Sequence, residues 1–322
     1  MKVAKFGGTS LASAEQIRKV CDIILADPQR RIIVVSAPGK RNKTDTKVTD
    51  LLIAAAKARL QGGSGKQELA AVIDRYREIG RDLGIPAATT AAVAADFTSR
   101  LESPIADENR FMDLMKAAGE DNCAKLVAQY LRRRGVEANY LSPRDAGLLV
   151  SEEYGNARVL PRSYDNLRSL RDAAGITIFP GFFGYSPQGE LVTFPRGGSD
   201  ITGSILAAAV RADVYENFTD VDSVFAAHPG LIPDAAPIAE LTYREMRELS
   251  YAGFAVLNDE ALEPVFRMGV PVNIRNTNNP SAPGTRIVLE RAITDRPVAG
   301  IAHGGAFCSI YVDKYLMNRE VG

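Results

Sequence analysis

The chain has 322 residues, 46% of them hydrophobic and 24% charged, which predicts one large or two smaller globular domains and excludes disordered, collagen-like and coiled-coil proteins. Lysine plus arginine and aspartate plus glutamate each number 39, so the net charge is zero and nucleic acid is not an expected partner. Three scattered cysteines, two histidines and the lack of a long apolar run exclude a disulfide framework, a zinc cluster and a membrane span, and a cytoplasmic location is expected.

The first elements in chain order are a short apolar strand over Lys2–Phe6, a turn over Gly7–Ser10 and a helix. Ser13 with Gln16 three residues later predicts a capping box at the start of that helix. The next strand, Arg31–Ser36, has no polar alternation, which is typical of a parallel strand buried on both faces. Together these elements predict a βαβ unit.

Residues 47–134 have a mainly helical pattern and are expected to form an insertion between strands. Strand and helix signals alternate after it. The expected strands lie at 137–141, 176–179, 191–194, 214–218 and 270–275, and the expected helices lie near 48–60, 66–83, 88–101, 120–134, 201–211, 242–250 and 259–268. This order predicts an α/β fold, a three-layer αβα sandwich around a mainly parallel sheet.

Two glycine-rich turns join a strand to a helix and carry groups suited to binding anions. In the first, Lys5 precedes Gly7 and Gly8, so its ammonium group can reach a phosphate held by backbone N–H groups. In the second, Arg196 precedes a helix start at Ser199 and Asp200, and an arginine fork beside a helix N-terminus suits a carboxylate. The structural alternatives are a solvated lysine in a tight turn and a helix cap formed by Ser199 or Asp200.

Two further acidic positions are candidates for ligand binding. Glu120 follows Gly119 at the expected start of a helix, where it could meet an amino group or merely complement the helix dipole. Thr219 and Asp220 end a buried strand, where open α/β sheets bind ligands, although turn formation is the alternative. No serine–histidine–aspartate set can be assembled from two histidines, so a nucleophilic triad is not expected.

Six segments, taken in this order along the chain, resemble the aspartokinases of the amino-acid kinase superfamily. The resemblance covers about residues 1–290. The segments are Lys5-Phe6-Gly7-Gly8-Thr9-Ser10, Val34-Val35-Ser36-Ala37, Gly119-Glu120, Arg196-Gly197-Gly198-Ser199-Asp200, Phe218-Thr219-Asp220-Val221 and Val272-Asn273-Ile274-Arg275-Asn276-Thr277.

The resemblance implies transfer of the γ-phosphoryl group of ATP to the side-chain carboxylate of L-aspartate, with Mg²⁺, as the first step towards lysine, threonine and methionine. It implies that Lys5 and Asp200 are catalytic, with Lys5 neutralising charge on the transferred group and Asp200 holding Lys5. No protein metal ligand is assigned. The implied aspartate-binding residues are Thr49, Glu120, Phe182, Arg196 and Ser199, and the implied nucleotide-binding residues are Lys5, Phe6, Gly7, Gly8, Thr219, Asp220 and Phe225.

Three positions depart from the family pattern on the nucleotide side. Ala255 stands where many relatives have a lysine, Phe225 where a tyrosine is frequent, and Gly230 where an arginine can contact the nucleotide. Segments such as Ser36–Arg41 and Tyr251–Phe254 resemble the single-function, lysine-responsive branch.

The resemblance also divides the chain. Residues 1–292 are expected to form the catalytic domain, and residues 293–322 the start of a truncated ACT regulatory domain. A homo-oligomer is expected. The alternatives are a different acyl-phosphate or nucleotide kinase of the same fold and a non-catalytic regulatory subunit.

Overall fold

A computed structural model describes residues 1–253, 257, 259–292 and 298–302. Its main sheet has eight strands in the order β3-β4-β2-β1-β7-β9-β10-β8, and all neighbouring pairs are parallel except β9 with β10. The strands are β1 Lys2–Phe6, β2 Arg30–Val35, β3 Ala138–Tyr140, β4 Ile176–Pro180, β7 Val214–Thr219, β8 Glu240–Thr242, β9 Val272–Asn276 and β10 Thr285–Val288, with a separate hairpin of β5 Phe183–Tyr185 and β6 Leu191–Thr193.

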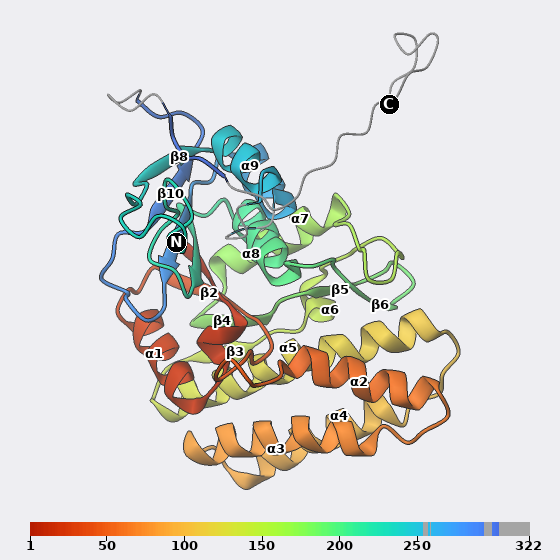
Figure 1. Cartoon of the computed structure of the whole chain (residues 1–322). Helices are drawn as coiled ribbons and strands as arrows, with labels where there is room; N and C mark the ends of the chain where they lie inside the picture. The colour runs from red at the N-terminus through yellow and green to blue at the C-terminus, as the bar shows by residue number, and fades with distance from the viewer. Residues whose placement is uncertain (254–256, 258, 293–297, 303–322) are drawn as a thin grey trace.

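Helices cover both faces of this sheet (Figure 1). On one face lie α1 Ala14–Leu25 and the helical insertion, α2 Val48–Leu60, α3 Lys66–Asp82, α4 Ala87–Leu101 and α5 Glu108–Arg133. On the other face lie α7 Arg162–Leu167, α8 Gly198–Ala209, α9 Tyr243–Tyr251 and α10 Glu263–Met268. The short elements are η1 Gly8–Leu11, α6 Pro143–Ala146, η2 Arg168–Asp172 and η3 Asp259–Leu262.

The two faces arise from the alternation of side chains along the central strands. In β1, Ala4 and Phe6 join the core beneath α1 and α5, whereas Val3 joins the core beneath α8. Strand β2 divides in the same way, because Ile33 and Val35 belong to the first core and Ile32 to the second. Both faces of the central strands are therefore apolar, and the predicted three-layer αβα fold is confirmed.

The expected helix at 120–134 has the wrong start. Helix α5 begins at Glu108, where the side chain of Asp107 accepts a hydrogen bond from the amide of Arg110, and it runs unbroken to Arg133. Gly119 lies inside this helix. A Cβ at this position would come within 2.7 Å of Ala37, so the close packing of α5 on the sheet requires a glycine.

Other expectations need smaller corrections. Ser13 caps α1, but the Gln16 side chain donates to Asn278 instead of completing a capping box. The segment 259–268 is a 3₁₀ turn followed by a short α-helix. Strands β8 and β10 were not expected, because each is a short segment with a weak apolar pattern. The expected start of an ACT domain lies almost entirely outside the described residues.

One buried acidic residue links strands β2, β7 and β9 on the α1 face. Glu216 of β7 binds Arg30 of β2 at 2.6 Å and Arg275 of β9 at 2.9 Å, and both guanidinium groups lie over the ring of Phe218. Burial alone would raise the pKa of the Glu216 carboxyl, but the hydrogen bonds and charges of the two arginines outweigh it and lower the pKa. The pair therefore stabilises the fold above the unfolded-state pKa, and this contribution is lost as the pH falls through the folded-state pKa.

We expect Glu216→Ala to lower the free energy of unfolding by about 3–5 kcal/mol, because it leaves a buried guanidinium without its partner. Urea unfolding at pH 7 measures this change. The matched control is Glu15→Ala, which breaks the exposed pair with Lys19 and should cost less than about 1 kcal/mol. Equal losses in the two variants would show that the Glu216 cluster adds no stability of its own.

Candidate active site

A small cavity of about 200 Å³ lies beyond the carboxyl ends of β1 and β2, where open α/β sheets bind ligands. Its wall is formed by strand ends, the insertion and the first turn of α8. The lining residues are Lys5, Ser36, Thr49, Glu120, Phe182, Gly197, Gly198, Ser199 and Asp200. Six residues predicted from the sequence thus meet in a space of amino-acid size, although they are spread over nearly 200 positions of the chain.

Lys5 and Asp200 form the charged centre of this cavity. The Lys5 ammonium lies 2.6 Å from Asp200 Oδ1, and the two side chains are only 8% and 16% exposed. Asn217 of β7 donates to the same carboxylate oxygen at 2.9 Å. The pair sets the Lys5 ammonium at the end of a central strand, where it can meet an anionic group.

The first glycine turn is held against a second loop by backbone contacts. The Gly7 amide donates to the carbonyl of Phe218, and the Gly39 amide donates to the carbonyl of Gly8 at 2.8 Å. A Cβ at Gly39 would come within 2.6 Å of the Gly8 carbonyl carbon, so only glycine permits this approach. Arg75 of α3 donates to the Gly39 carbonyl, which connects the insertion to the turn.

Glu120 lies in the middle of α5, so the helix-dipole explanation for its position is wrong. It is 5% exposed, and its Oε2 atom has no hydrogen-bond partner among the described residues. Burial raises the pKa of its carboxyl to about 8, even though the backbone amide of Ala37 partly offsets this effect. A buried carboxyl with an unsatisfied oxygen on a cavity wall is suited to binding a cationic group.

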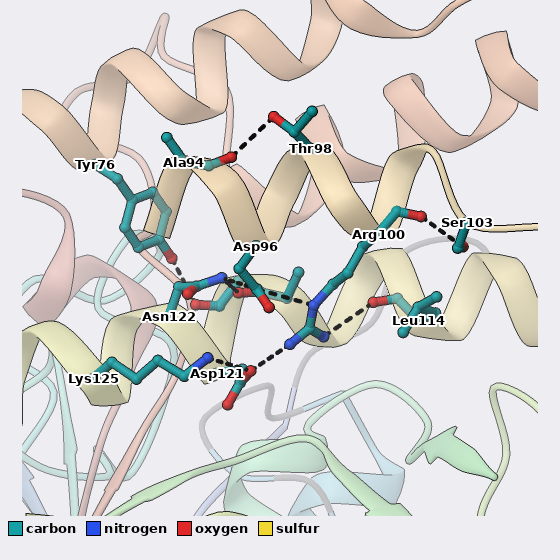
Figure 2. Close-up of polar contacts among 12 residues, drawn as sticks. Tyr76, Ala94, Asp96, Thr98, Arg100, Ser103, Leu114, Asp121, Asn122 and Lys125 are labelled. Carbon is teal, nitrogen blue, oxygen red and sulfur yellow. Dashed lines mark hydrogen bonds and ion pairs between the residues drawn. The ribbon is translucent and has the colours of Figure 1, made fainter. Parts of the chain in front are cut away.

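The turns of α5 around Glu120 are fixed by polar contacts with α3 and α4 (Figure 2). Tyr76 donates its hydroxyl to the Gly119 carbonyl at 2.6 Å. Asn122 donates to Asp96 at 2.7 Å, and Arg100 bridges Asp96 and Asp121. Residues on both sides of Glu120 are therefore anchored, which limits the positions that its carboxyl can take.

Phe182 occupies a conformation that side-chain-bearing residues rarely adopt, with φ of 79°. Its amide donates to the Thr202 hydroxyl, and its carbonyl accepts from the Phe194 amide. Its ring packs so closely on Gly198 that a Cβ there would lie 2.6 Å from the ring. Such strain, of order 1–3 kcal/mol, is concentrated at functional sites.

Helix α8 opens onto the cavity without a side-chain cap. Its N-cap residue is Gly197, with φ of 84°, and no side chain caps the helix, so the capping alternative for Ser199 and Asp200 is wrong. Arg196 immediately precedes this turn but is not among the residues that line the cavity. The start of α8 thus places positive potential at one end of the site.

The residues predicted to bind nucleotide lie beside the cavity. Phe6 is fully buried and stacks on Phe218, so its side chain supports the turn from within the core. Thr219 ends β7 and Asp220 follows it, next to Gly7, whereas Phe225 lies farther along that loop in a bridge with Pro237. Ala255 lies outside the described residues.

The described part of the chain contains no cluster of three or more His, Cys, Asp or Glu side chains that could hold a metal ion. None of the helices within it combines the length and apolar character needed to cross a membrane.

Three residues with evident roles at the site were missed in the sequence. Ser36 lines the cavity, Gly39 supports the glycine turn, and Asn217 binds the central pair. For Asn217 a signal existed, because an amide inside a strand that is otherwise buried requires a polar partner.

Comparisons with known proteins identify the family of this chain. Residues 1–276 match the model of the amino acid kinase family. Aspartokinase 3 of Bacillus subtilis is 55% identical over 322 residues, which are all of this chain and 71% of that protein.

Two solved structures are also similar. Aspartate kinase of Clostridium acetobutylicum has 35% identity and a TM-score of 0.83, covering 94% of this chain and 66% of its own. Aspartokinase III of E. coli, solved with aspartate and ADP, has 27% identity and a TM-score of 0.78, covering 91% of this chain and 65% of its own. The chain therefore belongs to the amino acid kinase family and, within it, to the aspartokinases.

The raised pKa of Glu120, about 8, predicts that binding of an amino acid releases a proton. Below pH 8 the empty site holds the protonated carboxyl, and an incoming ammonium group favours the carboxylate. We expect aspartate binding at pH 7 to release close to one proton per site, and affinity to rise with pH up to about 8. Calorimetry in buffers of different ionisation enthalpy measures the release, and an undiminished release in Glu120→Gln would contradict this assignment.

Proposed function

We propose that this chain transfers the γ-phosphoryl group of ATP to the side-chain carboxylate of L-aspartate, giving 4-phospho-L-aspartate and ADP. The observation that carries the proposal is that one small cavity has the unsatisfied Glu120 carboxyl at one wall and the Lys5 ammonium at another. An amino acid with a side-chain carboxylate can satisfy both. The similarity to an aspartokinase solved with aspartate and ADP supports the choice of substrates.

In this arrangement the residues mainly align and neutralise charge. Glu120 binds the substrate ammonium group, while Arg196 and the start of α8 bind its α-carboxylate. The side-chain carboxylate is already a nucleophile, so one of its oxygens forms the new bond to phosphorus, the bond from phosphorus to the ADP oxygen breaks, and no general base is needed. The Lys5 ammonium stabilises the charge that develops on the transferred group.

The remaining site residues have supporting roles in the proposal. Thr49, Phe182 and Ser199 shape the aspartate side of the cavity. Gly7 and Gly8 admit the phosphates close to the backbone. Thr219 at the end of the neighbouring strand β7, with Asp220 and Phe225 after it, is on the side proposed for the nucleotide.

Mg²⁺ fits this site as a companion of the nucleotide. It usually binds through substrate phosphates and only one or two protein carboxylates, so the absence of an acidic cluster in the described part does not conflict with it. Asp200, which lines the cavity, is the carboxylate available to it. When bound, the ion offsets phosphate charge.

Several finer expectations extend the proposal. A lysine-responsive role in amino-acid biosynthesis, a cytoplasmic location and a homo-oligomeric state stay predictions. The same holds for the division into a catalytic unit over 1–292 and the start of an ACT domain over 293–322, since residues 293–297 and 303–322 are not described.

The reaction can be tested by trapping the acyl phosphate with hydroxylamine across a panel of acidic amino acids with ATP. We expect hydroxamate to form with L-aspartate in strong preference to L-glutamate and acetylglutamate. Lys5→Ala should lower kcat by about 10²–10³, since it removes a preorganised charge. Hydroxamate formation on another acceptor alone, or near-normal turnover by a folded Lys5→Ala variant, would refute the assignment.

Arg196→Lys separates the two halves of the site. A lysine retains the charge but not the two-pronged geometry of the guanidinium, so aspartate should bind about tenfold more weakly while ATP binds almost unchanged. Calorimetric titration of each ligand separately gives both constants. Weakened ATP binding with unchanged aspartate binding would place Arg196 on the nucleotide side.

A further inference from the structure

Asn217 is a fully buried amide in the central strand β7, directly beside the charged pair of the site. In the sheet register it lies next to Lys5 of β1 on one side and Ile274 of β9 on the other. Side chains alternate along a strand, so Asn217 shares with Tyr215 the face covered by α8. The core does not need an amide at this position, because Tyr215 and Ile274, its neighbours on that face, already contribute apolar surface to the core.

The amide group of Asn217 contacts both members of the pair. Its Nδ2 atom donates to Asp200 Oδ1 at 2.9 Å, and its Oδ1 atom accepts from the Lys5 ammonium at 3.5 Å. Lys5 itself lies 2.6 Å from the same Asp200 oxygen. The three side chains therefore close a triangle in which one carboxylate oxygen accepts from two donors.

We propose that Asn217 is a positioning residue for phosphoryl transfer, which fixes the Asp200 carboxylate and thereby the Lys5 ammonium. This inference rests on the proposed function. A neutral amide suits the role because it offers a donor to the carboxylate and an acceptor to the ammonium without altering the charge of the site. A leucine offers neither, and an ionised aspartate offers no donor and adds a negative charge.

The contact between Asn217 and Asp200 should affect the rate because it holds the charged groups in place before the reaction. A charge stabilises the transition state most when it is already held where the new charge develops. Without Asn217, Asp200 would keep only its contact with Lys5, and the pair could rotate together away from the transferred group. The loss should therefore appear in kcat, whereas the aspartate groups bound by Glu120 and Arg196 are unaffected and KM should change little.

Tyr215 offers a matched control on the same strand and the same face. Its hydroxyl donates to the backbone carbonyl of Asp200 at 3.1 Å, so it anchors the start of α8 without touching the carboxylate. If Asn217 only anchored the helix, its substitution should change kcat as little as Tyr215→Phe does. If Asn217 orients the carboxylate, its substitution should lower kcat more.

The experiment measures kcat and aspartate KM by hydroxamate formation for Asn217→Leu and Tyr215→Phe, with urea unfolding of each. We expect Asn217→Leu to lower kcat by about 10- to 100-fold, as for loss of a hydrogen bond to a charged group, with KM within about threefold. Tyr215→Phe should keep kcat within about threefold. Equal kcat in Asn217→Leu and wild type, or a loss confined to KM, would overturn the inference.

Two further variants keep the test decisive if Asn217→Leu folds poorly. Asn217→Asp preserves the shape of the amide, and the charged groups that contact it are Lys5 of β1 and Asp200 of α8. Its ionised carboxylate offers no donor to Asp200 and adds a negative charge beside Lys5, so kcat should again fall by at least about tenfold with KM within about threefold. Wild-type kcat in a folded Asn217→Asp variant would contradict the positioning role.

In an Asp200→Asn background, Asn217→Leu should cost less than about threefold further, because the group that it positions is already changed. A full multiplicative loss would show that Asn217 does not act through Asp200. The outcomes also separate this inference from the proposed function. A wild-type protein that makes no hydroxamate from aspartate refutes the function, whereas an active wild type with unaffected Asn217 variants refutes only the inference.

Discussion

The need to keep one ammonium group charged inside the protein governs much of this structure. A lysine at the end of a central strand loses most of its hydration, and a nearby carboxylate offsets the free-energy cost of burying its charge. That carboxylate, Asp200, comes from the first turn of α8, so α8 must begin close to the end of β1. The uncapped helix start, the glycine turn and the buried amide of Asn217 all follow from bringing these two elements together.

The site also requires segments of the backbone to pack closely against each other, and glycines at two positions permit this. Gly39 lets one loop lie against the turn after β1, and Gly119 lets α5 lie against Ala37. The second contact places Glu120 on the cavity wall, because it fixes the height of α5 above the sheet. Polar contacts from α3 and α4 then prevent that helix from sliding. A methyl group at Gly39 or Gly119 would disturb this packing. The positions of the charged groups in the site thus depend on these two glycines.

The sequence was a good guide to the layered fold and to the two glycine turns that meet at the cavity, because apolar runs and glycine turns are local signals. Thr49 and Phe182 came only from the family resemblance. The sequence was a poor guide where tertiary packing decides. Gly119 looked like a boundary, which made Glu120 a helix-start residue, but the contact with Ala37 makes glycine favourable in mid-helix. Strands β8 and β10 depend on edge pairing that no local pattern encodes. The role of Asn217 depends on Asp200, which is near in space but 17 positions away.

The helical insertion divides the site in a way that bears on how such enzymes diverge. Thr49 and Glu120, which line the cavity on the side proposed for the acceptor, come from helices between β2 and β3, whereas Lys5 and Asp200 come from the sheet and α8. The insertion has its own buried aromatic contact, Tyr76 with Phe97, so part of its cohesion is independent of the sheet. Substitutions in this one segment can therefore change the acceptor preference without changing Lys5 and Asp200. The insertion is thus the natural unit to exchange when a new acceptor is sought.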